Sequence, residues 1–103
     1  MAGTMVQVCK TADVAAGKVK RFDVNKIPIA IYNIDGTFYA TEDTCTHGMA
    51  SLAEGALDGD VNECWMHFGA FHVPSGKPVS PPCTVPIKTF PVTVVEGAVL
   101  IEM

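Results

Sequence analysis

The chain has 103 residues and a formal net charge of −4 at pH 7. This length allows one small domain, residues 1–103, whose modest core is marginal without a staple such as a metal centre. The acidic balance argues against nucleic acid as a partner. No run approaches ~18 apolar residues, and the N-terminus lacks a charged segment followed by an apolar one. We therefore expect no membrane anchor, no secretory signal and a cytoplasmic location.

The N-terminal part of the chain predicts β-strands. Two strands are expected at residues 4–9 and 18–24, separated by a loop. The next two, at residues 29–34 and 37–40, flank Asp35-Gly36. This dipeptide favours a two-residue turn between antiparallel strands, because both residue types tolerate positive φ. The sequence therefore predicts a β-hairpin here.

Between residues 41 and 85 the pattern changes to short segments. These are interrupted by Asp58-Gly59, Ser75-Gly76 and Pro81-Pro82, which favour turns. No window has a helical period over ~10 or more residues. We expect at most a single helical turn in this part of the chain, at residues 49–53.

The C-terminal residues predict a closing hairpin. Residues 90–95 and 98–103 flank Glu96-Gly97 in the same manner as the earlier pair of strands flanks its own turn. We therefore expect an all-β fold. In it, antiparallel strands from the two ends of the chain form a base, and the middle of the chain is inserted between them.

Two short boxes contain cysteine and histidine in alternation, Cys45-Thr46-His47 and Cys64-Trp65-Met66-His67. Two thiolates and two imidazoles suit a mixed-ligand [2Fe–2S] cluster, in which the cysteines bind one iron and the histidines bind the other. The candidate ligands are Cys45, His47, Cys64 and His67. Each box would give one ligand to each iron, so two facing loops could clamp the cluster from both sides.

A structural zinc site is the alternative for these four residues, because two cysteines and two histidines also satisfy tetrahedral zinc. Zinc fingers usually group like ligands, as two cysteines followed by two histidines, whereas the types alternate here. The order favours the iron–sulfur centre. A zinc-stabilised interaction module stays open as the second interpretation.

The boxes resemble those of soluble Rieske-type ferredoxins, the small electron-transfer components of bacterial aromatic-ring oxygenase systems. Cys45-Thr46-His47-Gly48 matches the first family box. Cys64, His67, Gly69 and Phe71 stand at the matching positions of the second. The resemblance runs over nearly the whole chain, and it implies one Rieske-type [2Fe–2S] cluster with two cysteine and two histidine ligands.

The resemblance also implies a fold. Rieske proteins have an antiparallel β-sandwich base with an inserted cluster-binding subdomain of two ligand loops, which would fall at about residues 41–85. Ser80-Pro81-Pro82 resembles the proline-containing loop that covers the cluster in such proteins. Trp65 is a departure, because the family commonly has proline after the second cysteine.

The function implied by the resemblance is one-electron transfer. A Rieske domain takes up nearly all of the 103 residues, which leaves no room for a second catalytic domain, so the chain is expected to be a carrier and not an enzyme. Its expected partners are an NAD(P)H-dependent flavin reductase and a terminal aromatic-ring-hydroxylating dioxygenase, and we expect a monomer. A Rieske ferredoxin of a diiron monooxygenase system is the alternative.

The ligands and their neighbours predict a low potential within the Rieske range. Two imidazoles in place of two thiolates make the oxidised core neutral instead of dianionic, which eases the addition of an electron. High-potential relatives carry hydroxyls at the positions of Gly69 and Phe71, and respiratory-type relatives carry a disulfide at those of Ala50 and Met66. Hydrogen bonds to the sulfurs tune the potential. Without these groups we expect the low end, suitable for a flavin reductase.

We expect no ligand role for the remaining cysteines, the third histidine and the acidic residues. Cys9 and Cys83 are expected to be reduced, partly buried thiols, and His72 a surface or packing histidine. Six acids and no lysine or arginine lie between residues 42 and 72: Glu42, Asp43, Glu54, Asp58, Asp60 and Glu63. They form either an acidic collar that steers the cluster toward basic partners or a solvated face that maintains solubility.

Overall fold

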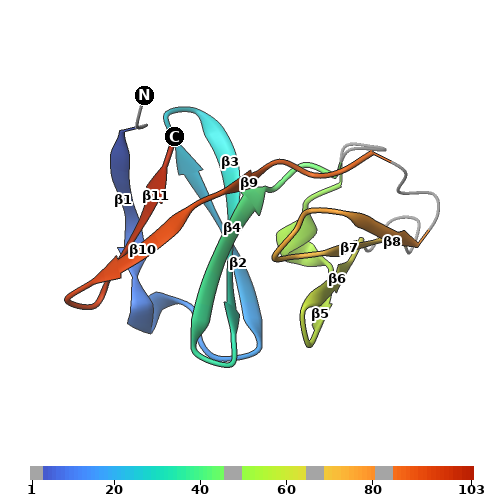
Figure 1. Cartoon of the computed structure of the whole chain (residues 1–103), viewed down its shortest axis with the longest axis horizontal. Helices are drawn as coiled ribbons and strands as arrows, with labels where there is room; N and C mark the ends of the chain where they lie inside the picture. Colours follow the sequence, from blue (N-terminus) through green and yellow to red (C-terminus); the bar gives the residue numbers. More distant parts are fainter. Residues whose placement is uncertain (1–3, 46–49, 65–68, 81–84) are drawn as a thin grey trace.

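The computed structural model describes residues 4–45, 50–64, 69–80 and 85–103. Strands in these ranges form three antiparallel sheets, and the same ranges contain two short 3-10 turns but no α-helix (Figure 1). The predicted all-β class is confirmed. From left to right in Figure 1, we call the three sheets the end sheet, the central sheet and the insert sheet.

The end sheet joins the two ends of the chain. In spatial order it contains β1 (Met5–Lys10), β11 (Ala98–Glu102) and β10 (Val92–Val95). Thr4 and Met103 exchange backbone hydrogen bonds of 3.2 and 3.1 Å just beyond β1 and β11. The predicted hairpin at Glu96-Gly97 is confirmed, and both turn residues have the positive φ that matches the twist of the flanking strands.

The central sheet holds the middle of the base. In spatial order it contains β2 (Lys18–Val24), β3 (Ile27–Ile34), β4 (Thr37–Glu42) and β9 (Thr89–Phe90). The predicted hairpin at Asp35-Gly36 is confirmed, again with positive φ at both residues. A second turn with two positive φ values, Asn25-Lys26, joins β2 to β3. The sequence does not predict it, because lysine is not a usual residue at such a position. A 3-10 turn, η1 (Thr11–Asp13), precedes β2.

The strand predicted at residues 90–95 is wrong as a single strand, because Pro91 divides it. Phe90 pairs with Ala40 of β4 in the central sheet, whereas Val92 pairs with Ile101 of β11 in the end sheet. Proline has no N–H to donate to a ladder, so it interrupts strand pairing. The chain uses this interruption to pass from one sheet to the other.

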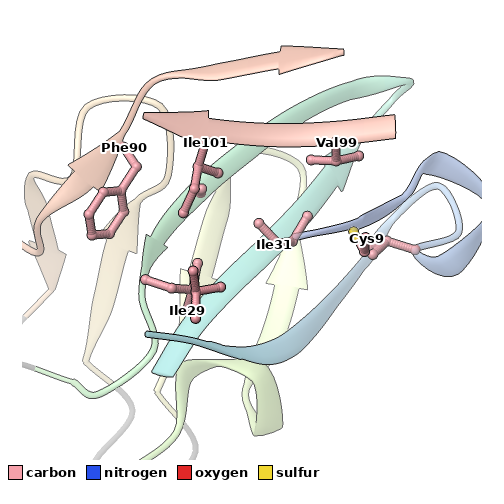
Figure 2. Packing of buried hydrophobic residues seen from close by; sticks show 9 residues of the cluster. Cys9, Ile29, Ile31, Phe90, Val99 and Ile101 are labelled. Atoms are coloured by element: carbon pink, nitrogen blue, oxygen red, sulfur yellow. The ribbon is translucent and has the colours of Figure 1, made fainter. Parts of the chain in front are cut away.

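The end and central sheets pack face to face over one apolar core, which confirms the predicted β-sandwich base. Its buried residues are Cys9, Val14, Val24, Ile29, Ile31, Ala40, Phe90, Val99 and Ile101. Figure 2 shows Ile29 and Ile31 of β3 pointing toward Ile101 and Val99 of β11. Alternate residues of a strand point to opposite faces, so this face of β3 belongs to the sandwich.

The insert sheet lies between β4 and β9 in sequence, although these two strands pair with each other. In spatial order it contains β5 (Ala56–Asp58), β6 (Val61–Glu63), β7 (Ala70–His72) and β8 (Pro78–Ser80). A 3-10 turn, η2 (Leu52–Glu54), precedes it and lies later in the chain than the turn expected at residues 49–53. The sheet itself was not predicted, because three-residue strands are too short to display an alternating pattern.

The opposite face of β3 holds the insert against the base. Ala30 and Tyr32 are buried there with Val73, which follows β7, and the half-buried Leu57 of β5 packs on the same cluster. β3 is therefore covered on both faces, as its continuous buried run from residue 29 to residue 33 reflects. This packing fixes the insert sheet relative to the sandwich.

Candidate metal centre

The two predicted cysteine ligands meet in one apolar cluster within the insert. Cys45 follows β4 and Cys64 follows β6, and their side chains are 2% and 0% exposed. The cluster consists of Cys45, Ala50, Leu52, Cys64, Phe71 and Ile87. The two predicted histidine ligands, His47 and His67, lie outside the described residues. The structure thus brings two of the four candidate ligands to a common place.

Matching backbone hydrogen bonds close the two loops that carry the boxes. The amide of Cys45 donates to the carbonyl of Ala50 at 2.9 Å, and the amide of Cys64 donates to the carbonyl of Gly69 at 2.6 Å. Each cysteine therefore pairs with the residue five positions later. Both boxes lie inside loops of the same length, and each loop is tied at the point where its cysteine enters it.

The donor set fits a group that binds thiolates from two loops. Both cysteines are buried among apolar side chains, which limit the access of water to anything bound there. Within the described ranges no three His, Cys, Asp or Glu side chains gather to hold a metal ion, and the two predicted histidines lie outside these ranges. Cys45 and Cys64 would supply the thiolates of such a site.

Cys9 belongs to a different part of the molecule. It is 7% exposed and packs in the sandwich core, which confirms its predicted burial, and it forms no disulfide with another described cysteine. Burial raises the pKa of Cys9, and Asp13 raises it further against the opposing effect of Lys20. Cys9 thus packs in the sandwich core, away from the cluster that contains Cys45 and Cys64. Cys83, the other cysteine without a predicted ligand role, lies outside the described residues.

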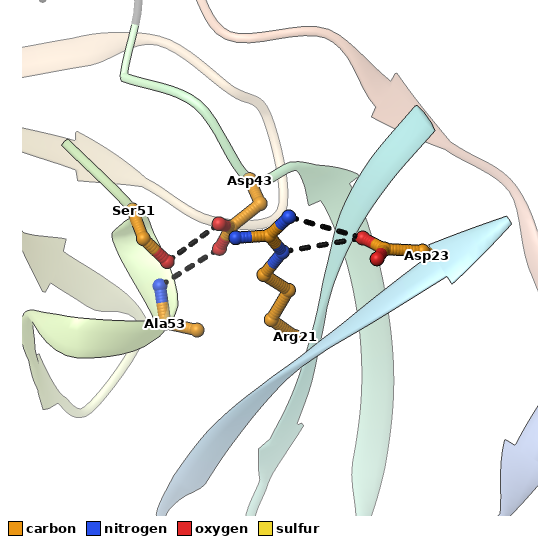
Figure 3. A network of polar contacts seen from close by, with 5 residues as sticks. All are labelled: Arg21, Asp23, Asp43, Ser51 and Ala53. Carbon is orange, nitrogen blue, oxygen red and sulfur yellow. Dashed lines mark hydrogen bonds and ion pairs between the residues drawn. The ribbon is translucent and has the colours of Figure 1, made fainter. Parts of the chain in front are cut away.

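Asp43 is not part of an exposed acidic collar, which corrects one member of that set. Its side chain is 1% exposed, and its carboxylate accepts hydrogen bonds from the hydroxyl of Ser51 and from the amide of Ala53, the latter at 2.9 Å (Figure 3). A buried carboxylate with two donors has a structural role, because it cannot contact a partner protein. Glu54, Asp58, Asp60 and Glu63 are exposed as expected, and Glu42 is half-buried.

Asn62 is a second buried polar residue beside the candidate centre, and its role was not predicted. It is 0% exposed, and its Nδ2 donates to the carbonyl of Leu52 at 2.8 Å. Its Oδ1 has no hydrogen-bond partner among the described residues. A signal was present in the sequence, since Asp43 and Asn62 stand two positions before Cys45 and Cys64.

His72 is a surface histidine, as predicted. Its Nε2 lies 3.0 Å from Oδ2 of Asp60, and its Nδ1 lies 2.7 Å from Oγ of Ser75. The two side chains of the His72–Asp60 pair are 38% and 53% exposed. These contacts tie the turn after β5 to the turn after β7, on the surface of the insert.

The side chains next to the cysteines contain no hydroxyl at the positions considered above. Phe71 is 1% exposed and packs in the cysteine cluster, and Gly69 is buried with its carbonyl engaged by Cys64. Ala50 is buried in the same cluster. Met66 and Trp65 lie outside the described residues, as do Pro81 and Pro82 of the proline loop.

Two exposed valines flank residues 81–84 in the chain. Val79 of β8 is 54% exposed and Val85 is 56% exposed. In the part of the chain that the structure describes, no helix is long and apolar enough to span a membrane.

Comparison with known proteins places these features in a family context. Residues 4–91 match the family described as the Rieske [2Fe-2S] domain. Ferredoxin CarAc of Metapseudomonas resinovorans is 53% identical over 97 residues, which cover 93% of this chain and 91% of that protein. The biphenyl dioxygenase ferredoxin subunit of Pseudomonas sp. (strain KKS102) is 42% identical over 100 residues, which cover 96% of this chain and 92% of that protein.

Solved structures agree in fold. The chain is similar to one from the complex of reduced oxygenase and oxidized ferredoxin in carbazole 1,9a-dioxygenase, with a TM-score of 0.89 and 52% identity over 95% of this chain and 92% of that one. The Sphingomonas yanoikuyae B1 ferredoxin gives a TM-score of 0.93 with 38% identity, over 97% and 99% of the two chains.

Proposed function

Because the chain belongs to the family of Rieske [2Fe–2S] domains, we propose that it is the ferredoxin component of an aromatic-ring-hydroxylating dioxygenase system. It carries one electron at a time and does not itself oxidise the organic substrate. The observation that carries this proposal is the pair of matched loops, in which Cys45 and Cys64 are tied by equivalent backbone bonds and buried in one cluster. Its relatives over nearly the full length are ferredoxins of such systems.

Four residues would hold the cofactor, one [2Fe–2S] cluster of the Rieske type. Cys45 and Cys64 would bind one iron, and His47 and His67 would bind the other. When bound, the cluster supplies a single reversible oxidation step within a range of about −150 to +300 mV. The described residues support this assignment through the chemistry of the two buried thiols and the equal lengths of their loops.

Apolar residues of this chain keep water away from the two cysteines, and two nearby positions lack a hydroxyl group. Leu52, Phe71 and Ile87 surround the cysteines with apolar surface, and neither Phe71 nor Gly69 offers a hydroxyl to a sulfur. A reduced cluster is more negative than an oxidised one, so hydrogen bonds to its sulfurs favour reduction. The lack of hydroxyls at these two positions supports the low potential predicted for a carrier that takes its electrons from a flavin.

The proposed partners are a terminal oxygenase and an NAD(P)H-dependent flavin reductase, both reached in the cytoplasm. The solved complex of a 52% identical ferredoxin with its oxygenase supports the first of these. On this chain, Val79 and Val85 are exposed on either side of the proline loop, and Glu54, Asp58 and Glu63 are exposed on the insert. A small apolar contact with acidic surroundings suits brief docking on basic partner surfaces.

Reconstitution tests the proposal. The purified chain is added to a flavin reductase, NADH and a terminal dioxygenase, and hydroxylated product is measured. We expect product only when the chain is present, none with Cys45→Ser, and close to parent levels with Cys9→Ser, which removes a buried thiol from the sandwich instead. Parent activity in Cys45→Ser, or a colourless parent that binds zinc and transfers no electron, would contradict the proposed function.

A further inference from the structure

The two cysteines are anchored in the same way to one short segment. Asp43 precedes Cys45 by two residues, and Asn62 precedes Cys64 by two residues. The Asp43 carboxylate accepts from Ser51 and Ala53, and the Asn62 amide donates to the carbonyl of Leu52. The three consecutive residues 51–53 therefore receive a buried polar side chain from each arm of the site. We call residues 51–53 the anchor segment.

Backbone contacts place the anchor segment firmly between the two arms. The amide of Leu52 donates to the carbonyl of Asp43 at 2.7 Å, which adds a main-chain bond to the side-chain ones. Gly55, at the end of η2, lies against β6 so closely that a Cβ would fall 1.9 Å from the carbonyl oxygen of Glu63. The main chain from Leu52 to Gly55 thus contacts both arms of the site, through Asp43 on one side and Glu63 on the other.

From this geometry we propose that Asp43 and Asn62 are positioning residues that fix Cys45 and Cys64 relative to each other through the anchor segment. In addition, the Asp43 carboxylate holds the reduction potential down. The proposal rests on the proposed function, because it concerns how the chain presents its cluster ligands. Neither residue is a ligand itself.

Asp43 and Asn62 differ in charge. This difference allows their shared effect on the position of the cysteines to be separated from the effect of Asp43 on the reduction potential. Among the described residues Asp43 forms no ion pair, whereas Arg21 pairs with Asp23 at 3.2 Å (Figure 3). A buried negative charge is poorly screened and disfavours the addition of an electron nearby. Asn62 is neutral, so its effect on the potential is expected to be small.

The negative charge of Asp43 also affects the pKa of a second buried group, the hydroxyl of Tyr32. Burial raises the pKa of Tyr32 strongly, the hydrogen bond to Thr41 lowers it, and the charge of Asp43 raises it again. Tyr32 lies at the interface between the central sheet and the insert. A carboxylate that disfavours the tyrosinate there also disfavours extra negative charge on a cluster held by Cys45.

Three variants of the iron-loaded protein test the proposal. Asp43→Asn keeps the shape and can still bond Ser51 and Ala53, but removes the charge. Glu54→Gln is the matched control, because it removes an exposed negative charge from the residue next to the anchor segment. Asn62→Leu keeps the branched shape of the side chain but removes its hydrogen bond to the Leu52 carbonyl, which then accepts only from the amide of Gly55 among the described residues. The midpoint potential and the rate of iron release to a chelator are measured for each.

We expect Asp43→Asn to raise the potential clearly above that of Glu54→Gln, and Asn62→Leu to release iron about 10-fold faster than the parent, in keeping with other outer-shell changes. Equal potentials in Asp43→Asn and Glu54→Gln, or parent-like iron release in Asn62→Leu, would overturn the proposal. If the parent shows no reversible redox step, the proposed function fails instead.

Ser51→Ala decides the case should Asp43→Asn not retain iron. This variant keeps the carboxylate but removes the hydroxyl of Ser51 that donates to it, so the charge is less compensated. The proposal then requires the potential to fall, opposite in sign to the Asp43→Asn effect. A potential equal to or above the parent's would contradict it.

Discussion

The sandwich base and the insert are built in opposite ways. In the base, β2 and β3 pair over seven residues, and nine buried side chains form one core. In the insert, β5 and β6 pair over three residues, and the apolar cluster has six members, two of which are the proposed cysteine ligands. Because the insert buries few apolar side chains, it is also held by the hydrogen bonds of the buried Asp43 and Asn62 and by the close packing of Gly55.

This difference indicates that the base provides most of the folding stability, whereas the insert holds the cluster. The base can fold mainly by burying apolar surface, because its core is the larger of the two. The insert has too small a core to be stable by the same means and needs a cluster between its two loops as a staple. Removal of iron should therefore loosen the insert and leave the base folded.

Matched core truncations test this division most strongly. Ile31→Ala in the base and Leu52→Ala in the insert each remove a fully buried side chain, at a local cost of about 2–5 kcal/mol. We expect Ile31→Ala to lower the free energy of global unfolding and Leu52→Ala to speed iron loss and amide exchange within the insert. Denaturant titration and hydrogen exchange measure the two effects. Equal global destabilisation by both variants would show that base and insert form one cooperative unit.

Gly55→Ala tests the close contact inside the insert. Its φ is −83°, so alanine suits the backbone, but the new Cβ would lie 1.9 Å from the Glu63 carbonyl oxygen. Overpacking of this kind costs about 1–3 kcal/mol, since backbone and not a flexible side chain must move. We expect faster iron release with little change in the exchange of β2 and β3 amides. Gly97→Ala, at a base turn, is the control and should leave iron release unchanged.

Tyr32 tests the interface between the two regions through pH. Burial is the main cause of its raised pKa, so the folded protein keeps the proton at a pH where the unfolded chain loses it. The resulting stability is complete below the unfolded pKa of about 10 and is lost as the pH rises above it, by up to about 1.4 kcal/mol per pH unit. Tyr32→Phe should lack this part of the slope. Identical alkaline unfolding curves for parent and variant would show that Tyr32 is not buried against the insert.

Most of the base could be predicted from the sequence, because its strands are long enough to show alternation and two of its turns carry a glycine that takes positive φ. The division at Pro91 was missed, since an apolar run does not show which of two sheets each half joins. Asn25-Lys26 was missed because lysine does not mark a turn.

The sequence predicts the candidate ligands, two of which the structure brings together, but it does not predict the polar residues that support them. Cys45 and Cys64 stand out through their spacing, and their burial in one cluster agrees with the prediction. Asp43 was assigned to a surface collar, because an acidic residue among other acids looks exposed. Its burial depends on hydrogen bonds with Ser51 and Ala53, and such contacts between segments have no periodic pattern in the chain.

The most direct test of the central claim is the iron and acid-labile sulfide content of two cysteine variants. Cys64→Ala removes a proposed ligand from the insert, and Cys9→Ala removes a buried thiol from the base. We predict about two irons and two sulfides per chain in Cys9→Ala, as in the parent, and hardly any in Cys64→Ala. A Cys64→Ala protein that kept about two irons and two sulfides per chain would contradict the assignment of the cluster to these loops.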